Sequence, residues 1–512
     1  MSKRLTGVIN FLAWSAIFAI IYAQSPIYSA NQNTYFLHGL ARAGLGNLDR
    51  DWLANTLDSL PVFTALVYWT YTLLRSGFPF YVYYALQLGV YFFSLLGIAD
   101  VLFGIRKSKT QTLVFIAAFF LIHSAAFHYL LSGLLTTDAP FLLESGVASQ
   151  RLLGPVFQPS TFGVFLVLSV YLFLRGRHFL SLIPLAIAIY FHSVYLLTGA
   201  LMVLAFMWVL YRTEKALKRL ILFGATALVL VLPALLYTTY AFWPTSPEIN
   251  QQANNLLINF RIPHHTIVTE WLDWTVAVQV GLILVTLYLT RRTTLFPILA
   301  ILFTSSLLLT IVQVISRNDT LALLYPWRVS VLLVPISVSI LLAFLTTRLA
   351  VLRETRSVRF ERAVTVFSFA IIIGLIGIGW VRFQIESGLL MKAESYPVMM
   401  YVAAHHSPDD AYIIPPKLRD FRLVTGVPIY IDAYSIPYHD VDFLEWYRRV
   451  QQVNAFYRKA KRSCDDVANF MNLTESTHLI LPTDKVAKTC LNKSEVIYQD
   501  DHYLVLTPLD IP

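Results

Sequence analysis

Long apolar runs dominate this chain and limit what it can fold into. Eleven of them approach the ~20 residues that an α-helix needs to cross a bilayer; they lie at 5–23, 80–104, 111–132, 161–175, 179–192, 194–211, 220–241, 275–290, 294–315, 327–347 and 363–381. Apolar residues make up 57% of the 512 residues, and charged residues only 13%, against about 25% charged in soluble chains. The sequence therefore predicts an all-α polytopic membrane protein with about eleven transmembrane helices.

Basic residues fall on every second connection between these runs. Six clusters hold 18 of them: Lys3/Arg4, Arg106/Lys107/Lys109, Arg175/Arg177, Arg212/Lys215/Lys218/Arg219, Arg291/Arg292 and Arg348/Arg353/Arg356/Arg359/Arg362. The first loop and the alternate connections hold only seven basic residues. Because cytoplasmic loops carry the excess of Lys and Arg, the pattern predicts a cytoplasmic N-terminus and an extracytoplasmic C-terminus. Membrane topology also explains the formal charge of +9, so we expect no nucleic-acid partner and a bacterial inner or plasma membrane location.

Two domains are expected. Residues 1–381 form the transmembrane domain, with a first outer loop at 24–79, and residues 382–512 form a small extracytoplasmic α/β domain. Within the second domain, short apolar stretches predict strands at 411–414 and 478–481 and a hairpin from 496–498 and 503–507. The only cysteines, Cys464 and Cys490, both lie there. A disulfide is plausible in an oxidising compartment, and two free thiols are the alternative.

The first outer loop carries the strongest candidates for chemistry. It contains Asp49, Asp51 and Asp58, followed by an aromatic apolar segment at 61–71. That segment is too short to cross the bilayer comfortably, and counting it as a span would reverse the charge pattern of every later connection. We therefore expect an interfacial helix, with its Trp and Tyr residues at the level of the lipid headgroups. A solvated loop with helix-capping aspartates is the alternative interpretation.

The order of residues in this loop resembles the GT-C superfamily of membrane glycosyltransferases, in particular its aminoarabinose-transferase and protein O-mannosyltransferase branches. The loop contains Tyr35, Asp51-Trp52, Asp58, Pro61 and an aromatic run to Tyr71, in the order of those branches. The resemblance implies a sugar-transfer reaction at the outer face of the membrane with a polyprenyl-phosphate sugar as donor. One feature departs from the pattern, because Asn31 and Gln32 stand where those branches have an acidic pair.

Such a reaction needs a base and a group that binds phosphate. A carboxylate takes the proton of the acceptor hydroxyl as it attacks the anomeric carbon, and we expect Asp51 in this role, with Asp58 and Asp49 as further candidates. The leaving phosphate needs positive charge or N–H donors. For this role the outer loops offer Arg261, His264, His265, Arg328 and His192. We expect these residues to share one cavity with Asp51 and Asp58.

Each substrate-binding residue also has a simpler explanation. Arg328 can extend to the headgroups beside Trp327, His192 can be a packed core histidine, and the two adjacent histidines can belong to a loop made rigid by Pro263. Asp138 and Glu144, with Arg151, could line the path of the acceptor or form a solvated ion-pair cluster.

The sequence therefore favours a glycosyltransferase acting on membrane lipid and lipid-linked sugar. The acceptor, a saccharide, a lipid or a protein, stays open. A transporter or flippase for lipid-linked saccharides and a catalytically silent scaffold of the same fold are the alternatives. No cluster has metal-ligand spacing, so no metal site is predicted; a divalent cation stays open, and no other cofactor is expected.

Overall fold

The computed structural model describes residues 3–135, 140–351, 358–459, 462–485 and 494–508. By its internal contacts the chain forms two compact units. We call Met1–Gln24, Phe80–Tyr240 and Asn254–Gln384 the helical unit, and Ser25–Pro79, Ala241–Ala253 and Ile385–Pro512 the mixed unit. The first outer loop thus groups with the C-terminal residues, although hundreds of residues separate them in the sequence. The predicted domain boundary after residue 381 stays a prediction.

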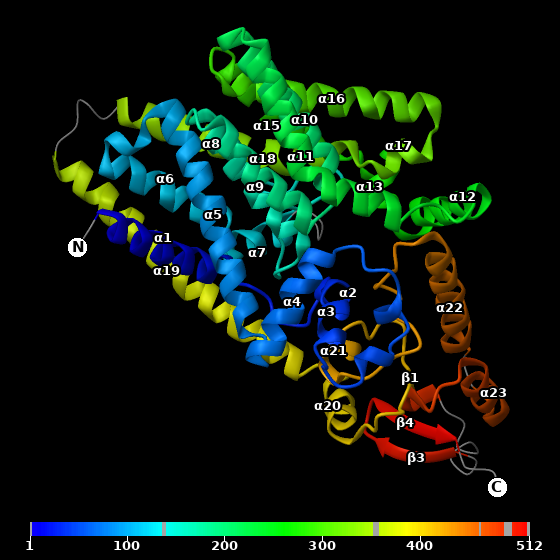
Figure 1. The fold of residues 1–512 in the computed structure, drawn as a ribbon. Coiled ribbons are helices and arrows are strands. Elements are labelled where there is room, and N and C mark those ends of the chain that lie inside the picture. Colours follow the sequence, from blue (N-terminus) through cyan, green and yellow to red (C-terminus); the bar gives the residue numbers. More distant parts are fainter. Residues whose placement is uncertain (1–2, 136–139, 352–357, 460–461, 486–493, 509–512) are drawn as a thin grey trace. The chain divides into compact units, whose positions relative to one another are not determined.

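The helical unit contains the apolar helices. Its long helices are α1 (Lys3–Tyr22), α5 (Phe78–Phe103), α10 (Tyr195–Glu214), α11 (Leu217–Ala241), α16 (Leu295–Ser316), α18 (Ser330–Val351) and α19 (Val358–Met391) (Figure 1). The shorter ones are η3 (Ile105–Lys107), α6 (Lys109–Ile122), α7 (Ala125–Leu134), η4 (Pro159–Gly163), α8 (Val164–Leu174), α9 (His178–Phe191), η5 (Leu257–Arg261), α13 (Pro263–Thr266), α14 (Val268–Trp271), α15 (Trp274–Thr290), α17 (Asp319–Leu323) and η6 (Pro326–Val329).

Every apolar run that the sequence predicted as a span contains a helix. Within the described residues, seven helices are long and apolar enough to cross a membrane, or eight if the bent pair α6 and α7 is one span. The other three predicted spans are shorter apolar helices, at Pro159–Leu174, His178–Phe191 and Trp274–Thr290. The chain is therefore a polytopic α-helical membrane protein, and the count of eleven stays a prediction.

Burial divides these helices into central and peripheral ones. The apolar window that contains α18 is 78% buried, whereas that of α11 is only 11% buried. On α11 the side chains of Leu222 and Val229 are 59% and 67% exposed. A contiguous apolar surface of this kind is stable in lipid and unfavourable in water, so α11 has the character of a lipid-facing helix.

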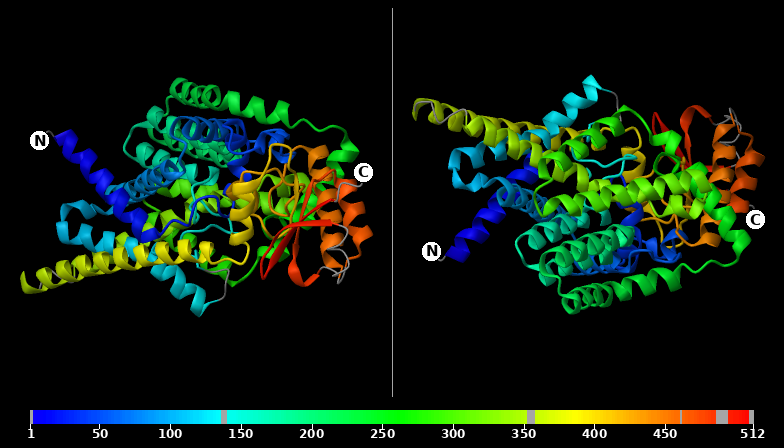
Figure 2. Two further views of the ribbon diagram at one scale, coloured as in Figure 1. Left: turned by 90° about the horizontal axis from the view of Figure 1, so that it is seen from below. Right: turned by 90° about the horizontal axis from the view of Figure 1, so that it is seen from above.

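One close helix contact needs a glycine. Gly379 of α19 packs on the backbone of Ile20 and Ile21 at the end of α1, and a Cβ at Gly379 would overlap the carbonyl oxygen of Ile20. Figures 1 and 2 show α1 and α19 converging along their lengths. Small residues permit such approaches between membrane helices.

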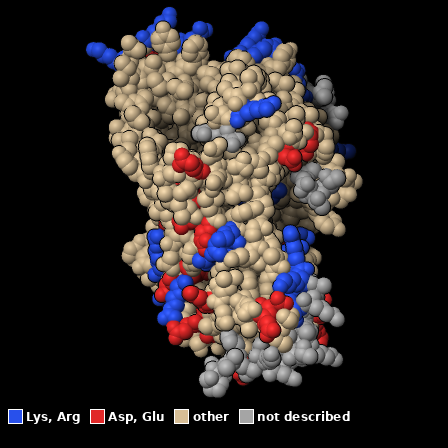
Figure 3. Space-filling view, turned by 90° about the vertical axis from the view of Figure 1, so that its right-hand side faces the viewer, with Lys and Arg blue, Asp and Glu red and all other residues tan. Residues whose placement is uncertain are grey.

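Charge is unevenly distributed over the helical unit. On the face drawn in Figure 3, Lys and Arg side chains gather at one end of this unit, at the top of the view, above a broad surface with few charged side chains. This distribution fits the alternation of basic clusters in the sequence. The side of the membrane on which that end lies stays a prediction.

The mixed unit contains the sheet and its helices. They are α2 (Gln32–Tyr35), α3 (Leu37–Arg42), η1 (Leu48–Arg50), η2 (Leu53–Asn55), α4 (Pro61–Leu74), α12 (Pro247–Leu256), α20 (Tyr396–His405), β1 (Tyr412–Ile413), α21 (Phe421–Thr425), α22 (Asp440–Arg458), α23 (Cys464–Thr474), β2 (His478–Pro482), η7 (Thr483–Lys485), β3 (Ser494–Gln499) and β4 (Tyr503–Pro508). The strand order is β1-β2-β4-β3, with β1 parallel to β2 and the other pairs antiparallel. All the predicted strands are present, and the predicted hairpin is β3–β4.

The core of the mixed unit is the contact between α20 and the sheet. Val398, Met399 and Val402 of α20 are at most 2% exposed and pack with Ile480 of β2 and Val505 of β4. Burying such side chains stabilises the fold by about 1.5–3 kcal/mol each. This core lies within the C-terminal segment; hydrogen bonds such as that from Asn47 N–H to the Gly426 carbonyl, at 2.8 Å, join the segment to the first outer loop.

Helix α4 is the segment that we expected in the membrane interface. Its Phe63 and Val67 are buried, and Gly39 of α3 packs directly on Val67. Trp69 and Leu73 on the same helix are 57% and 73% exposed. An exposed apolar face opposite a packed face is typical of an interfacial helix; the location in the interface stays a prediction.

Candidate functional site

Asp51, the expected base, is completely buried in an ion cluster of the mixed unit. Its Oδ2 atom lies 2.8 Å from Nε of Arg422, and Nη1 of Arg422 lies 2.7 Å from Oδ2 of Asp432. All three side chains are at most 1% exposed. Burial alone would lower the pKa of Arg422, but the two carboxylates outweigh it and the pKa lies above its ordinary value.

Backbone N–H groups donate the other hydrogen bonds that the Asp51 carboxylate accepts. Oδ1 accepts from the N–H groups of Leu53, at 2.9 Å, and Ala54, at 3.3 Å, and Oδ2 also accepts from Ile429 N–H at 3.0 Å. The Asp51 carboxylate therefore accepts hydrogen bonds from the backbone N–H groups of the turn that contains η2. Through Arg422 and Ile429 it also joins the first loop to the C-terminal segment. This geometry fits a structural role for Asp51 better than the role of a base, which needs an oxygen that the substrate can reach.

Asp49 and Asp58 lie in different surroundings. Asp49 is exposed, in η1. Asp58 is 7% exposed and precedes α4, where its Oδ1 accepts from Leu60 N–H and from the Thr64 hydroxyl, both at 3.0 Å. Its Oδ2 lies 3.3 Å from Nη2 of Arg42. Asp58 also lines a pocket of the mixed unit.

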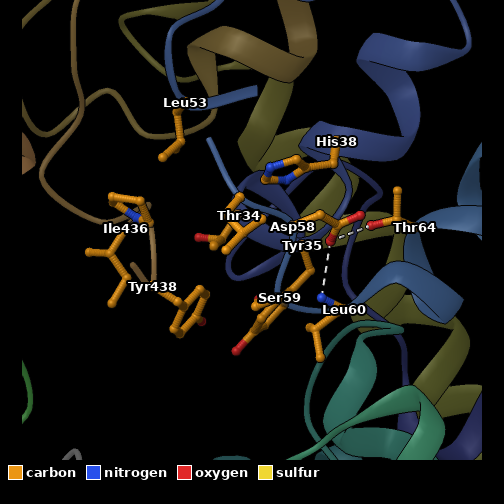
Figure 4. A pocket seen from close by; sticks show the side chains of 12 residues that line it. Thr34, Tyr35, His38, Leu53, Asp58, Ser59, Leu60, Thr64, Ile436 and Tyr438 are labelled. Carbon is orange, nitrogen blue, oxygen red and sulfur yellow. Dashed lines mark hydrogen bonds between the residues drawn. The ribbon is translucent and has the colours of Figure 1, made fainter. Parts of the chain in front are cut away.

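That pocket combines polar and aromatic side chains from both segments of the mixed unit (Figure 4). The first loop contributes Thr34, Tyr35, His38, Leu53, Leu57, Asp58, Ser59, Leu60 and Thr64, and the C-terminal segment contributes Ile436, Pro437 and Tyr438. Nε2 of His38 donates to the carbonyl oxygen of Thr56 at 3.1 Å. Burial lowers the pKa of His38 below its ordinary value, although Asp58 acts in the opposite direction. The pocket can therefore offer hydroxyl, imidazole and carboxylate groups to a polar ligand.

Gln32, at one of the two positions where the related branches have an acidic pair, contributes to the fold of the loop. Oε1 of Gln32 accepts from Tyr28 N–H at 2.7 Å, and Gln32 is 3% exposed. The neighbouring Asn33 donates to Oδ1 of Asp420 at 2.7 Å. The amide of Gln32 thus has a clear role in the fold of the loop. Positions 31 and 32 carry amides and no carboxylate.

In the helical unit, the expected phosphate-binding residues lie together. Arg328, in η6, donates from Nη2 to the Tyr195 hydroxyl at 3.3 Å, and its guanidinium lies 5.0 Å from the Tyr195 ring centre. His192 packs edge-on against the same ring at 5.3 Å and lies within electrostatic range of Arg328. Nε of Arg328 is buried, with no hydrogen-bond partner among the described residues. An N–H donor of this kind is available to an anionic ligand.

The adjacent histidines complete this basic cluster. Nδ1 of His265 lies 2.7 Å from the carbonyl oxygen of Ala148, and the rings of His264 and His265 are 4.1 Å apart. Burial lowers the pKa of His265 to about 3, and His264, Arg328 and Arg261 contribute in the same direction. The charged neighbours that act on His265 are thus all basic. We call Arg261, His264, His265, Arg328 and His192 the basic cluster.

The basic cluster and the aspartates belong to different units. The five predicted binding residues come together in the helical unit, whereas Asp49, Asp51 and Asp58 lie in the mixed unit. The single cavity that we expected for all of them stays a prediction. The predicted disulfide also stays a prediction, because Cys490 lies outside the described residues, as does Asp138. Among the described residues there is no group of three or more His, Cys, Asp and Glu side chains that could hold a metal ion.

Glu144 is the centre of a second buried polar group in the helical unit, with more contacts than the sequence indicated. Glu144, which we expected to line the acceptor path or to belong to a solvated ion-pair cluster, is 3% exposed and accepts from the Tyr22 hydroxyl at 2.9 Å. His128 and His123 lie 3.5 Å and 3.8 Å from its two oxygens. Burial alone would raise the pKa of Glu144, but His128, His123 and Tyr22 outweigh it, so the pKa lies below its ordinary value.

The partners of several of these residues have no local signal in the sequence. Arg422 and Asp432 look like ordinary surface residues of a soluble domain, and nothing in their local sequence indicates a partner near residue 51. His123 and Ser124 interrupt an apolar run and are the one available signal for a break between α6 and α7. Tyr195 follows the predicted His192 by three residues, so one helical turn could have suggested their contact.

Long apolar helices together with a separate α/β unit define the class of protein, a polytopic membrane protein with a mixed α/β part. A family model described as a domain of unknown function, DUF6798, matches residues 393–453, which include Arg422 and Asp432. None of the curated proteins matches the chain. Among solved structures, the chain is similar to ArnT from Cupriavidus metallidurans bound to undecaprenyl phosphate, with 13% identity, a TM-score of 0.47 and coverage of 99% of this chain and 98% of that one. It is also similar to the apo state of ArnT, with 13% identity, a TM-score of 0.45 and coverage of 99% of both chains.

Proposed function

We propose that this protein is a glycosyltransferase that moves a sugar from a polyprenyl-phosphate donor to an acceptor hydroxyl at the outer face of the membrane. The observation that carries the proposal is the convergence of the basic cluster. Its members come from three separate stretches of the chain, at His192, at Arg261 to His265 and at Arg328, and each stretch adjoins apolar helices. Charged residues beside apolar spans are costly and often functional.

The chemistry of the cluster suits a phosphate on a lipid. A guanidinium with a free N–H binds phosphate oxygens through charge-assisted hydrogen bonds, and neighbouring imidazoles can add further donors. As the anomeric carbon leaves the phosphate, negative charge grows on the leaving oxygen, and donors already in place stabilise it most. The apolar helices around the cluster supply the environment for the polyprenyl chain.

Asp58 has a different part in this proposal. Two of its hydrogen bonds fix it before α4, and Arg42 lies beside its other oxygen. A carboxylate held in this way, in a pocket with Thr34, Tyr438 and His38, is suited to accept hydrogen bonds from sugar hydroxyls. We propose that Asp58 binds the acceptor or the donated sugar.

The test is a transfer assay with the full chain in proteoliposomes and a panel of labelled undecaprenyl-phosphate pentoses and hexoses. We expect Arg328→Gln to lower the rate roughly 100-fold or more, the usual scale for one oxyanion donor. Arg317→Gln, at an exposed arginine after α16, is the matched control and should stay within about twofold, as expected for a surface substitution. Transfer that Arg328→Gln leaves unchanged, or wild-type protein that forms no glycosidic bond with any donor of the panel, contradicts the proposal.

A transporter for lipid-linked saccharides is the second candidate, and one observation favours it. Helices α6 and α7 meet at an angle of 51° around His123, and broken membrane helices are frequent at transport sites. A transporter would move a fluorescent lipid-linked saccharide across vesicles without forming a glycosidic bond. A silent scaffold of the same fold would do neither.

A further inference from the structure

The break between α6 and α7 lies beside a buried carboxylate. Helix α6 ends at Ile122, and Ser124 begins α7 by accepting from Phe127 N–H at 3.1 Å. A serine at this position satisfies the free N–H groups of a new helix and so favours a fresh start over continuation. The break turns α7 so that His128, one turn into it, lies next to Glu144.

Glu144 is held from several sides. The Tyr22 hydroxyl, at the end of α1, donates to its Oε1, and Nε2 of His128 lies 3.5 Å from the same oxygen. Oε2 is buried and has no hydrogen-bond partner among the described residues. Leaving a carboxylate oxygen unpaired in a buried site is unfavourable, so its retention points to a use beyond packing.

The two histidines beside Glu144 differ in what they can do. Nδ1 of His123 lies 2.8 Å from the carbonyl oxygen of Phe119, which can only accept, so this nitrogen carries the proton. Nε2 of His123 is then an acceptor, and the Tyr91 hydroxyl lies 3.1 Å from it. His123 is therefore committed to structure and is 1% exposed. His128 is the more accessible imidazole, with a side chain that is 12% exposed.

Rings on both sides fix the orientation of His128. The Phe141 ring centre lies 4.6 Å away and that of Tyr22 lies 5.6 Å away, the latter edge-on. With Nε2 turned toward Glu144, the other ring nitrogen, Nδ1, is the one that a substrate would meet. An imidazole with a buried carboxylate beside one nitrogen, and its other nitrogen turned away from that carboxylate, has the arrangement of a general base.

The connection that carries Glu144 also runs beside the basic cluster, within the same unit. The carbonyl of Ala148 contacts His265, as described above, and Val147 N–H donates to the Ser330 hydroxyl at 2.8 Å, two residues after Arg328. Gln279 Nε2 adds bonds of 3.2 Å to the carbonyl oxygens of Leu142 and Ser145. The chain between Glu144 and Ala148 is thus fixed, with the carboxylate near one end and the basic cluster at the other.

We propose that His128 is the base of the transfer reaction and that Glu144 is its positioning residue. This inference rests on the proposed function. In the step, the acceptor hydroxyl oxygen forms a bond to the anomeric carbon and gives its proton to Nδ1 of His128. The bond between that carbon and the phosphate oxygen breaks, and the phosphate leaves with the electron pair toward the basic cluster. Glu144 stabilises the imidazolium formed in the step.

The pair supplies the base that the first loop lacks. Asn31 and Gln32 stand in place of an acidic pair, and Asp51 is fully engaged with Arg422. Besides His128 itself, the titratable and charged groups around Glu144 are Tyr22 of α1, Tyr84 and Tyr91 of α5, His123 at the end of α6, and Arg151 in the following connection. His123 is held by its contacts with Phe119 and Tyr91, so His128 is the imidazole of this group that can meet a ligand.

The experiment measures transfer by the full chain in proteoliposomes across pH 5–9. We expect His128→Ala to lower the rate roughly 100-fold or more, within the usual range for loss of a general base, and added imidazole to restore about tenfold. His128→Gln, which keeps the size of the side chain, should also be slow if it folds like the wild type. Glu144→Gln should move the acid limb of the pH–rate profile to lower pH, because the charge that stabilises the imidazolium is gone.

A matched control uses another histidine–glutamate pair of the helical unit. Nδ1 of His178 lies 3.8 Å from Glu214, and His178→Ala and Glu214→Gln should leave both rate and profile unchanged. The inference is overturned if the wild type is active and His128→Ala stays within a few fold of it, or if imidazole restores nothing and Glu144→Gln keeps the wild-type profile. If Asp58→Asn removes the acid limb of the pH–rate profile and His128→Ala does not, the base is Asp58 and the inference is overturned. A wild type without any transfer removes the proposed function itself, and this inference with it.

Discussion

At the scale of single residues, partners decide what a carboxylate does. Asp49, Asp51 and Asp58 lie within ten residues of each other and look equivalent in the sequence. Asp49 is exposed, Asp51 is fixed by Arg422, and Asp58 lines a pocket. The surroundings of Asp51 come from Arg422 and Ile429, about 370 positions away, which no local pattern can indicate. By contrast, the grouping of Arg328 with His192 and His265 was predicted, because their types and their places at span ends already favour anion binding.

The buried ion cluster makes a residue-scale prediction. Asp51→Asn leaves Arg422 with one carboxylate fewer in a buried site, and breaking a buried pair costs about 3–5 kcal/mol. We expect the mixed unit to lose stability by this order, measured by urea unfolding of the full chain in detergent micelles. The exposed Asp49→Asn is the control and should change stability by less than about 0.5 kcal/mol. Equal stability of the two variants would contradict the structural role of Asp51.

At the scale of elements, patterning predicted most helices and all four strands. The hairpin β3–β4 lies within a few residues of its predicted bounds. The break between α6 and α7 was missed, and the segment was predicted as one span at 111–132, because His123 and Ser124 are only a short polar interruption of an apolar run. A cap becomes visible only when its hydrogen bond to Phe127 is seen.

A glycine contact in the mixed unit gives an element-scale prediction. Gly46 has a positive φ of 54°, and a Cβ there would overlap the backbone of Gly426. Gly46→Ala should therefore lower stability by more than the roughly 1 kcal/mol expected for a strained φ alone. Gly44→Ala is a matched control, since Gly44 has a φ of 75° but open space around it. Thermal unfolding should place Gly46→Ala below Gly44→Ala; the reverse order would contradict the contact.

Helix α22 gives a prediction about pH. Hydrogen bonds from Arg448 and then Arg449 lower the pKa of Glu445 to about 2. A lowered carboxyl pKa adds stability above the ordinary value near 4.5, and this stability is lost as the pH falls toward 2. Glu445→Gln should thus lower the thermal midpoint at pH 7 slightly, equivalent to less than about 1 kcal/mol of stability, because Arg448 is exposed and solvent screens a half-buried Glu445. The difference from the wild type should disappear near pH 2; a difference that grows in acid would contradict it.

At the scale of the whole molecule, the class of membrane protein was predicted, but the grouping of the first outer loop with the C-terminal segment in one compact unit was not. Apolar runs and alternating basic clusters are local in the sequence, so they predicted a polytopic membrane protein with a small α/β part. The union of residues 25–79 with residues 385–512 depends on long-range contacts such as Asn47 N–H with the Gly426 carbonyl at 2.8 Å. The same is true of the pair His128 and Glu144, which topology brings together.

The most direct test of the central claim is whether the chain recognises a phosphate on a lipid. Native mass spectrometry of the full chain can compare undecaprenyl phosphate with undecaprenol, which has the same tail without the charge. We predict at least about tenfold tighter binding of the phosphate, equivalent to ~1.4 kcal/mol, a preference that Arg328→Gln removes and Arg317→Gln keeps. Equal binding of the two lipids by the wild type, or an unchanged preference in Arg328→Gln, would contradict the account.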